Sequence, residues 1–182
     1  MATLSITRLR TYASFIKLEH TVFSLPLIVA GSLIAAEGWP RGQTLWLIVL
    51  AAAGGRVMAM SLNRIIDAQI DARNPRTKNR ELARGAMAQW EAWLVTAIAG
   101  VVYFGSAAEL APICLRLSPI PVALFVIYPY LKRVTMLSHV GLGLAWSMAP
   151  LGGWLAVSGS LARFDEVVWL WLFSWLWVAG FD

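Results

Sequence analysis

The chain has 182 residues, of which 59% are hydrophobic and 14% are charged, and its mean hydropathy is +0.66. Soluble domains carry about a quarter charged residues, so this composition argues against a soluble domain and favours a multi-pass helical membrane protein. The net charge of +5 does not indicate nucleic-acid binding, because the basic residues gather in particular loops, and the single cysteine, Cys114, excludes an internal disulfide.

Six apolar segments predict six membrane-spanning helices, because each approaches the ~20 residues that cross a bilayer. In chain order they cover residues 20–37, 43–66, 88–108, 110–130, 138–159 and 166–182. Turn-forming residues separate them, as in the Glu-Gly-Trp-Pro sequence at 37–40. We therefore expect residues 1–182 to form one membrane-embedded domain of all-α architecture.

The distribution of basic residues predicts the orientation of these helices. The N-terminal segment, the loop after the second span and the loop after the fourth span hold most of the Lys and Arg residues. Loops rich in these residues face the cytoplasm by the positive-inside rule. We therefore expect the N-terminus and the loop after the second span to be cytoplasmic.

Residues 63–84 form the most informative stretch, because acidic, amide and basic side chains crowd together at the end of an apolar run. Asn63, Asp67 and Asp71 are spaced four residues apart, so on a helix they project from one face. Two carboxylates and an amide suit Mg²⁺, which proteins usually hold by one or two carboxylates together with substrate phosphates. The alternative is an ordinary solvated loop, but charges at the margin of a span are costly without partners or a function.

Two pairs of basic residues follow this acidic face. A turn after Pro75 would bring Lys78 and Arg80 back over the aspartates, and Lys132 and Arg133 end the fourth segment on the same side. Arg and Lys both bind phosphate oxygens, so these four residues are candidates to hold a diphosphate beside the metal. The alternative is that they serve only as a topology signal or attract anionic lipid.

Arg56 and Glu19 are further candidates. Arg56 lies seven residues before Asn63 on nearly the same helix face, and an Arg within a span normally faces the bundle interior. We expect it to pair with an acid or to line the substrate pocket, where it would add to the diphosphate-binding set. Glu19 opens the first span and is placed to contact a polar substituent of an acceptor ring.

The stretch from Asn63 to Leu82 resembles the first aspartate-rich motif of the UbiA superfamily of membrane prenyltransferases, notably its bacterial 4-hydroxybenzoate polyprenyltransferases. Residues 17–26, 128–133 and 180–182 resemble the opening helix, the basic segment after helix four and the start of the second aspartate-rich motif. The resemblance implies that Mg²⁺ is held by Asn63, Asp67, Asp71 and Asp182. It implies equally that the leaving diphosphate is neutralised by Lys78, Arg80, Lys132 and Arg133.

The resemblance implies an enzyme of the bacterial inner membrane that ionises a prenyl diphosphate and joins the allylic cation to an aromatic ring carbon. The acceptor would be 4-hydroxybenzoate or a similar compound in ubiquinone biosynthesis, and Asp67, Asp71 and Arg80 would be catalytic. Two alternatives stay open. One is a menaquinone precursor as acceptor, and the other is a cation-coupled transporter with the two aspartates as ion ligands.

Two features differ from the pattern of the superfamily. The family has about nine helices, and the last segment here, Val167–Phe181, gives only about 22 Å of helix against a ~30 Å bilayer core. We therefore expect an N-terminal fragment or one piece of a split protein, inactive on its own. Arg64 follows Asn63 where many superfamily members have an acid, which fits the bacterial subgroup.

Overall fold

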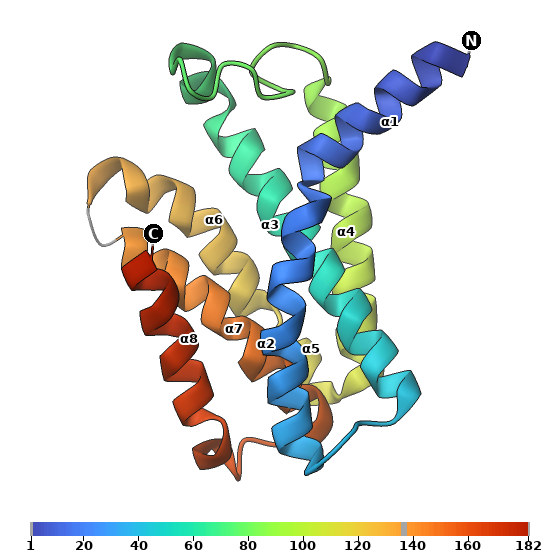
Figure 1. The fold of residues 1–182 in the computed structure, drawn as a ribbon, viewed down its shortest axis with the longest axis vertical. Coiled ribbons are helices and arrows are strands. Elements are labelled where there is room, and N and C mark those ends of the chain that lie inside the picture. Colours follow the sequence, from blue (N-terminus) through green and yellow to red (C-terminus); the bar gives the residue numbers. More distant parts are fainter. Residues whose placement is uncertain (1, 136–137, 182) are drawn as a thin grey trace.

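The computed structural model describes residues 2–135 and 138–181, and the side chains of residues 2–7 and 18–24 lie outside this description. Within the described residues the chain forms helices and no strand, which confirms the predicted all-α architecture (Figure 1). In chain order the elements are α1 (Ala2–Ile16), α2 (Leu18–Ala36), α3 (Gly42–Arg73), α4 (Gln89–Leu110), α5 (Pro112–Leu117), α6 (Pro119–Val134), α7 (Ser138–Ser158), the 3₁₀ helix η1 (Phe164–Glu166) and α8 (Val168–Phe181).

The local sequence explains where these helices end. Helix α2 stops at Glu37, which has a left-handed backbone (φ 51°) and is followed by a glycine. Helix α3 stops at Asn74, whose extended backbone (φ −95°, ψ 122°) is the conformation imposed on a residue before proline. Helices α5 and α6 each begin on a proline, which lacks the N–H that the first turn leaves unpaired.

The six predicted segments each contain a helix, but the structure differs from the prediction in three respects. Helix α3 continues to Arg73 instead of ending near residue 66, because neither Gly nor Pro interrupts it once the apolar run has ended. The fourth segment is divided at Ser118 into α5 and α6. Helix α1 is additional; the sequence prediction began at residue 20 because the preceding residues are less apolar.

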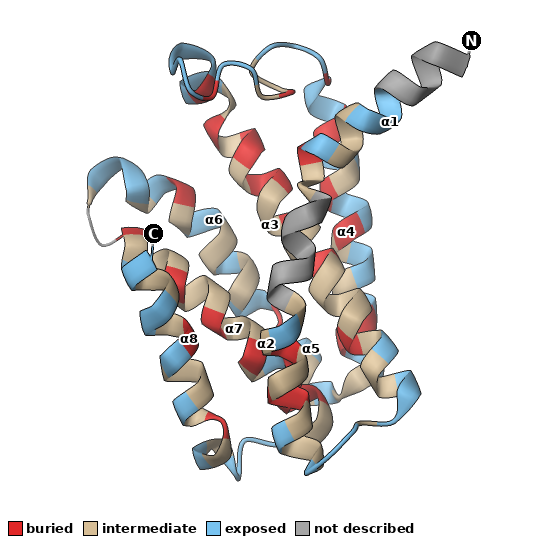
Figure 2. Cartoon of the chain, in the orientation of Figure 1, coloured by how far each residue is buried: buried red, intermediate tan, exposed pale blue. Residues whose placement is uncertain are grey.

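Four stretches are long and apolar enough to cross a bilayer, and together they cover the second to fifth predicted spans. They are Gly42–Arg73, Gln89–Leu110, Pro112–Val134 and Ser138–Ser158. Two shorter apolar helices, Leu25–Ala36 and Val168–Phe181, accompany them. Large apolar side chains such as Trp169 and Trp46 are exposed, as expected of a surface in contact with lipid. Exposed residues lie along the outward faces of α4 and α8 (Figure 2).

Close backbone contacts hold the helices together. Helix α3 packs mainly against α4, and α2 packs against α7, which in turn packs against α8 (Figure 1). Glycines permit the approach: a Cβ on Gly54 would lie 2.9 Å from the Ala99 carbonyl oxygen of α4. A Cβ on Gly153 of α7 would collide with the carbonyl oxygen of Ile28 on α2.

One end of the bundle gathers the segments that carry the candidate site residues. The segment 74–88 covers the Arg73 end of α3, close to α1, and the Val134 end of α6 lies toward the same end (Figure 1). A buried apolar cluster of Phe15, Ile65, Met87 and Ala92 joins α1, α3, the segment 74–88 and the start of α4. This packing brings segments that are distant along the chain against the end of α3 that carries the predicted acidic face.

Candidate functional site

The acidic face lies on the last turns of α3, as the four-residue spacing predicts. Asp67 is 1% exposed and Asp71 is 6% exposed, so both carboxylates are withdrawn from solvent although they lie near a helix end. Asn63 is half-buried one turn before Asp67. A buried carboxylate is costly unless a cation or hydrogen-bond donor meets it, and the structure places basic residues against each aspartate.

Asp67 is held by the two basic residues at the end of α6. The ammonium group of Lys132 pairs with Asp67 Oδ2, and Arg133 Nη2 lies 3.0 Å from Asp67 Oδ1. Arg133 also donates to the carbonyl oxygen of Ile66 at 3.0 Å. The tertiary structure therefore brings the second predicted basic pair into direct contact with the acidic face.

Asp71 is held by the segment 74–88. Arg80 Nη1 donates to Asp71 Oδ2 at 2.7 Å, and the Thr77 hydroxyl donates to the Asp71 carbonyl oxygen at 3.1 Å. The turn after Pro75 thus returns Arg80 to the aspartates, as expected. Lys78 behaves differently: it is exposed and has no ion pair within the described part of the chain.

A second ion pair, which the sequence did not indicate, anchors the same segment. Arg64 and Glu81 are each 5% exposed and form a salt bridge. The Ser14 hydroxyl of α1 donates to the other Glu81 oxygen at 2.6 Å. Arg64 therefore pairs with Glu81 instead of with an aspartate. Glu81 is the residue missed from sequence, because no spacing rule links it to Arg64.

The Glu81 carboxylate is stabilised in its charged form. Burial by itself raises its pKa, but the hydrogen bonds it accepts from Ser14 and from backbone, and the charge of Arg64, outweigh burial and lower the pKa. Glu81 is therefore a charged anchor at neutral pH.

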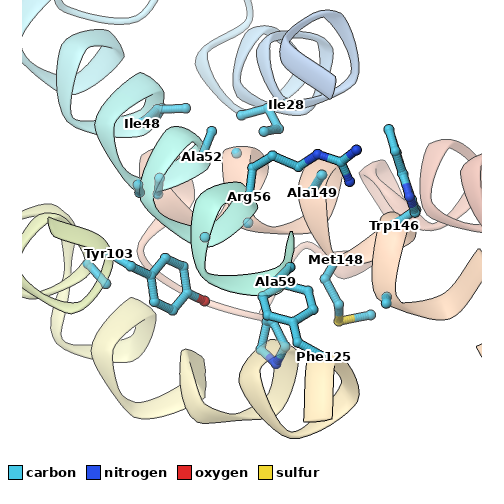
Figure 3. Close-up of a pocket in the computed structure, with 18 of the residues that line it drawn as sticks. Ile28, Ile48, Ala52, Arg56, Ala59, Tyr103, Phe125, Trp146, Met148 and Ala149 are labelled. Carbon is cyan, nitrogen blue, oxygen red and sulfur yellow. The ribbon is translucent and has the colours of Figure 1, made fainter. Parts of the chain in front are cut away.

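An apolar cavity of about 210 Å³ lies deeper in the bundle, between α2, α3, α4, α6 and α7. Small and apolar side chains dominate its wall, and among the residues that the structure describes Arg56 is the only charged one that lines it (Figure 3). The Arg56 guanidinium lies 5.0 Å from the ring centre of Trp146 on α7. Its Nε is buried and has no hydrogen-bond partner among the described residues.

The donor set at the acidic face fits a hard divalent cation. Two carboxylates and the Asn63 amide offer the oxygen ligands that Mg²⁺ prefers, and the neighbouring cations could neutralise a phosphate ligand of the same metal. Among the described residues no group of three or more His, Cys, Asp or Glu gathers at one point. Two predicted site residues are not placed here, because the Glu19 side chain and Asp182 lie outside the described residues.

Comparison of the sequence with known proteins identifies the family of this chain. The model of the UbiA prenyltransferase family matches residues 24–182. The chain belongs to the UbiA prenyltransferase family. This membership, together with the four long apolar stretches, makes it an integral membrane protein.

Individual UbiA relatives agree with this assignment. The 4-hydroxybenzoate octaprenyltransferase of Shewanella denitrificans is 29% identical over 180 residues, which cover 97% of this chain and 61% of that protein. The chain therefore spans about three fifths of the length of the curated relatives that it matches.

Two solved structures share the fold. The apo structure of a UbiA homologue from Aeropyrum pernix K1 superposes with a TM-score of 0.83 at 39% identity, over 90% of this chain and 62% of that one. A digeranylgeranylglyceryl phosphate synthase structure superposes with a TM-score of 0.82 at 20% identity, over 96% of this chain and 61% of its own, and supports the fold alone.

Proposed function

We propose that this UbiA protein acts in the Mg²⁺-dependent transfer of a polyprenyl group from an allylic diphosphate to an aromatic acceptor. The observation that supports this proposal most directly is the buried pair of aspartates, which form ion pairs with Lys132, Arg133 and Arg80. The same bundle contains an apolar cavity. The relatives named 4-hydroxybenzoate octaprenyltransferase support an acceptor of that type. A menaquinone precursor is the alternative acceptor.

The arrangement suits the ionisation of an allylic diphosphate. The C–O bond would break with its electron pair going to the diphosphate, a ring carbon would attack the allylic cation, and the ring would then lose a proton to the released diphosphate or to water. Bound Mg²⁺ would supply positive charge to the leaving group. Lys132, Arg133 and Arg80 would turn from the aspartates to phosphate oxygens, with Lys78 reaching the same group from solvent.

The cation-coupled transporter is less well supported by the site. Intramembrane ion sites of transporters lie near the bilayer midplane, on broken helices. Here the aspartates lie on a continuous helix, near its end, beside cations suited to phosphate. We propose a bacterial inner membrane location with this end of the bundle in the cytoplasm.

Binding of a labelled prenyl diphosphate tests the proposal. We expect the chain in lipid nanodiscs to bind radiolabelled geranyl diphosphate with Mg²⁺ and to lose this binding with EDTA. Asp67→Asn should weaken binding at least tenfold, about 1.4 kcal/mol, because it removes a metal ligand. The matched control is Asp165→Asn, an exposed acid in η1, which should bind as the parent does. Equal binding with and without Mg²⁺ would contradict the metal role.

A further inference from the structure

Helix α1 reaches two carboxylates that lie far from it along the chain. The Tyr12 hydroxyl donates to Glu91 Oε1 at 2.7 Å, and Arg8 Nη1 lies 2.8 Å from the same oxygen. The Ser14 hydroxyl donates to Glu81 Oε1 at 2.6 Å. Glu91 is 7% exposed and Glu81 is 5% exposed, so both carboxylates need the donors that meet them. Three side chains of one helix therefore end on two acids that the proposed mechanism does not use.

Each of these acids also holds the segment 74–88. Glu91 Oε2 accepts a hydrogen bond from the Ala88 backbone N–H at 2.7 Å, at the place where the segment joins α4. Glu81 belongs to the segment itself, and its carbonyl oxygen accepts from the Ala86 N–H at 2.9 Å. The contacts of α1 thus restrain the segment both at its middle and at its end.

The connection between α1 and α2 sets the direction of α1. Lys17 separates the two helices and has a left-handed backbone (φ 51°, ψ 58°), which costs free energy in a residue other than glycine. Helix α1 departs there from the axis of α2 and passes beside the start of α4 (Figure 1). Phe15 is 0% exposed and packs in this place with Met87 and Ala92. A strained conformation persists where surrounding contacts impose it, and here the contacts are those with the segment 74–88 and α4.

We propose that α1 positions the phosphate-binding cations of the segment 74–88, an inference that rests on the proposed function. Arg80 directly precedes Glu81, and Lys78 lies three residues before it, so restraint of the Glu81 side chain also restrains the backbone from which both cations extend. A segment that is ordered before the ligand arrives loses less conformational freedom on binding, and this favours affinity. Helix α1 thereby contributes to diphosphate binding without touching the diphosphate.

Amide hydrogen exchange without ligand tests the restraint. Tyr12→Phe and Ser14→Ala each remove one hydroxyl and leave the rest of the packing in place. In nanodiscs we expect the amides of the segment 74–88 to exchange about tenfold faster in the double variant, because two hydrogen bonds to charged groups are lost. Amides within α7 should keep the exchange rates of the unmodified chain.

Binding of radiolabelled geranyl diphosphate with Mg²⁺ measures the consequence for the site. The double variant should bind about three- to tenfold more weakly, because binding must then order the segment. Ser14→Thr in place of Ser14→Ala keeps the hydroxyl at an exposed position and should recover part of this affinity. The matched control is Ser158→Ala, which removes a hydroxyl hydrogen bond to the Ser160 carbonyl oxygen at the end of α7 and should change neither exchange in the segment nor affinity.

Four outcomes would overturn the inference. The first is unchanged exchange in the segment 74–88, and the second is faster exchange in α7 as well, which would mark a merely structural role for α1. The third is unchanged affinity despite faster exchange in the segment, and the fourth is a threonine at position 14 that binds no better than alanine. Failure of the proposed function is separate, because it appears as absent geranyl diphosphate binding in the unmodified chain, where hydrogen exchange still decides whether α1 holds the segment.

Discussion

At the scale of single residues, the site is a set of buried charges that neutralise one another across distant segments. Asp67 and Asp71 meet cations from α6 and from the segment 74–88, and Arg64 meets Glu81. The first two pairings leave the cations 31–35% exposed at their side chains, whereas Arg64 and Glu81 are both 6% exposed. The exposed cations can turn to an incoming anion, while the enclosed pair is structural.

Glu81 predicts a specific acid sensitivity. Because its pKa is lowered by folding, its carboxylate contributes its full stabilisation above the ordinary pKa of 4.5, and this contribution is lost as pH falls through the lowered pKa. Glu81→Gln should cost about 3 kcal/mol at neutral pH, because Arg64 loses its charged partner, and should show a shallower loss of stability on acidification. Thermal unfolding in detergent as a function of pH measures both effects.

The control for this prediction is Glu109→Gln, an exposed acid at the far end of α4. It should leave the pH profile of unfolding unchanged. A Glu81→Gln profile parallel to that of the unmodified chain would show that the carboxylate carries no acid-sensitive stabilisation.

At the scale of elements, the position of the site depends on how closely α2, α3, α4 and α7 approach. Glycines at the crossings allow backbone-to-backbone contact, so the cavity wall is built from helices that have little room to shift. Helix α3 carries both Arg56, which lines the cavity, and the aspartates on one continuous stretch, which sets the spacing between the cavity and the acidic face. Small residues at helix crossings therefore serve the geometry of the site as well as stability.

Two neighbouring glycines on α7 test this packing. Gly153→Ala should lower the melting temperature, with a cost of about 1–3 kcal/mol, because its Cβ would collide with the rigid Ile28 carbonyl of α2. Gly152→Ala should be neutral or stabilising by up to about 1 kcal/mol, because nothing lies within 4 Å of the added carbon and alanine favours a helix. Equal shifts in melting temperature for the two variants would contradict the close crossing.

At the scale of the whole molecule, the charges of the candidate site gather at one end of the bundle. The segment 74–88 lies at the opposite end from the connection between α2 and α3 (Figure 1). The outward side chains between these ends are largely apolar, and the tryptophans among them suit the interfaces of a bilayer. The proposed orientation places the end of the bundle that carries the acidic face on the cytoplasmic side.

Labelling of engineered cysteines tests this orientation. In a Cys114→Ser background, Arg41→Cys should react with a membrane-impermeant maleimide in intact spheroplasts, because the positive-inside rule places the start of α3 outside the cytoplasm. Lys78→Cys should react only after the membrane is permeabilised. Both positions are exposed, so access to reagent should depend on sidedness alone. The reverse pattern would contradict the orientation.

The sequence alone was sufficient for the local features of this UbiA protein. Apolar runs near bilayer length predicted the apolar helices from α2 onward but not α1, and Asn74-Pro75 and Pro119 explain where helices end or begin. The spacing of Asn63, Asp67 and Asp71 predicted one helix face, because helical periodicity depends only on positions close together in the chain. Residue-type chemistry likewise indicated oxygen ligands for a metal beside cations for a phosphate.

Only the tertiary structure decided which of these charges meet. The contacts of Lys132 and Arg133 with Asp67, and of Glu81 with Arg64, join segments whose separation along the chain carries no periodic signal. Whether Lys78 or Arg80 reaches the aspartates depends on the path of an irregular segment, and the place of Arg56 depends on which helices enclose it. Such pairings follow from the burial of a whole bundle, where each charge must find the partner that the packing brings within reach.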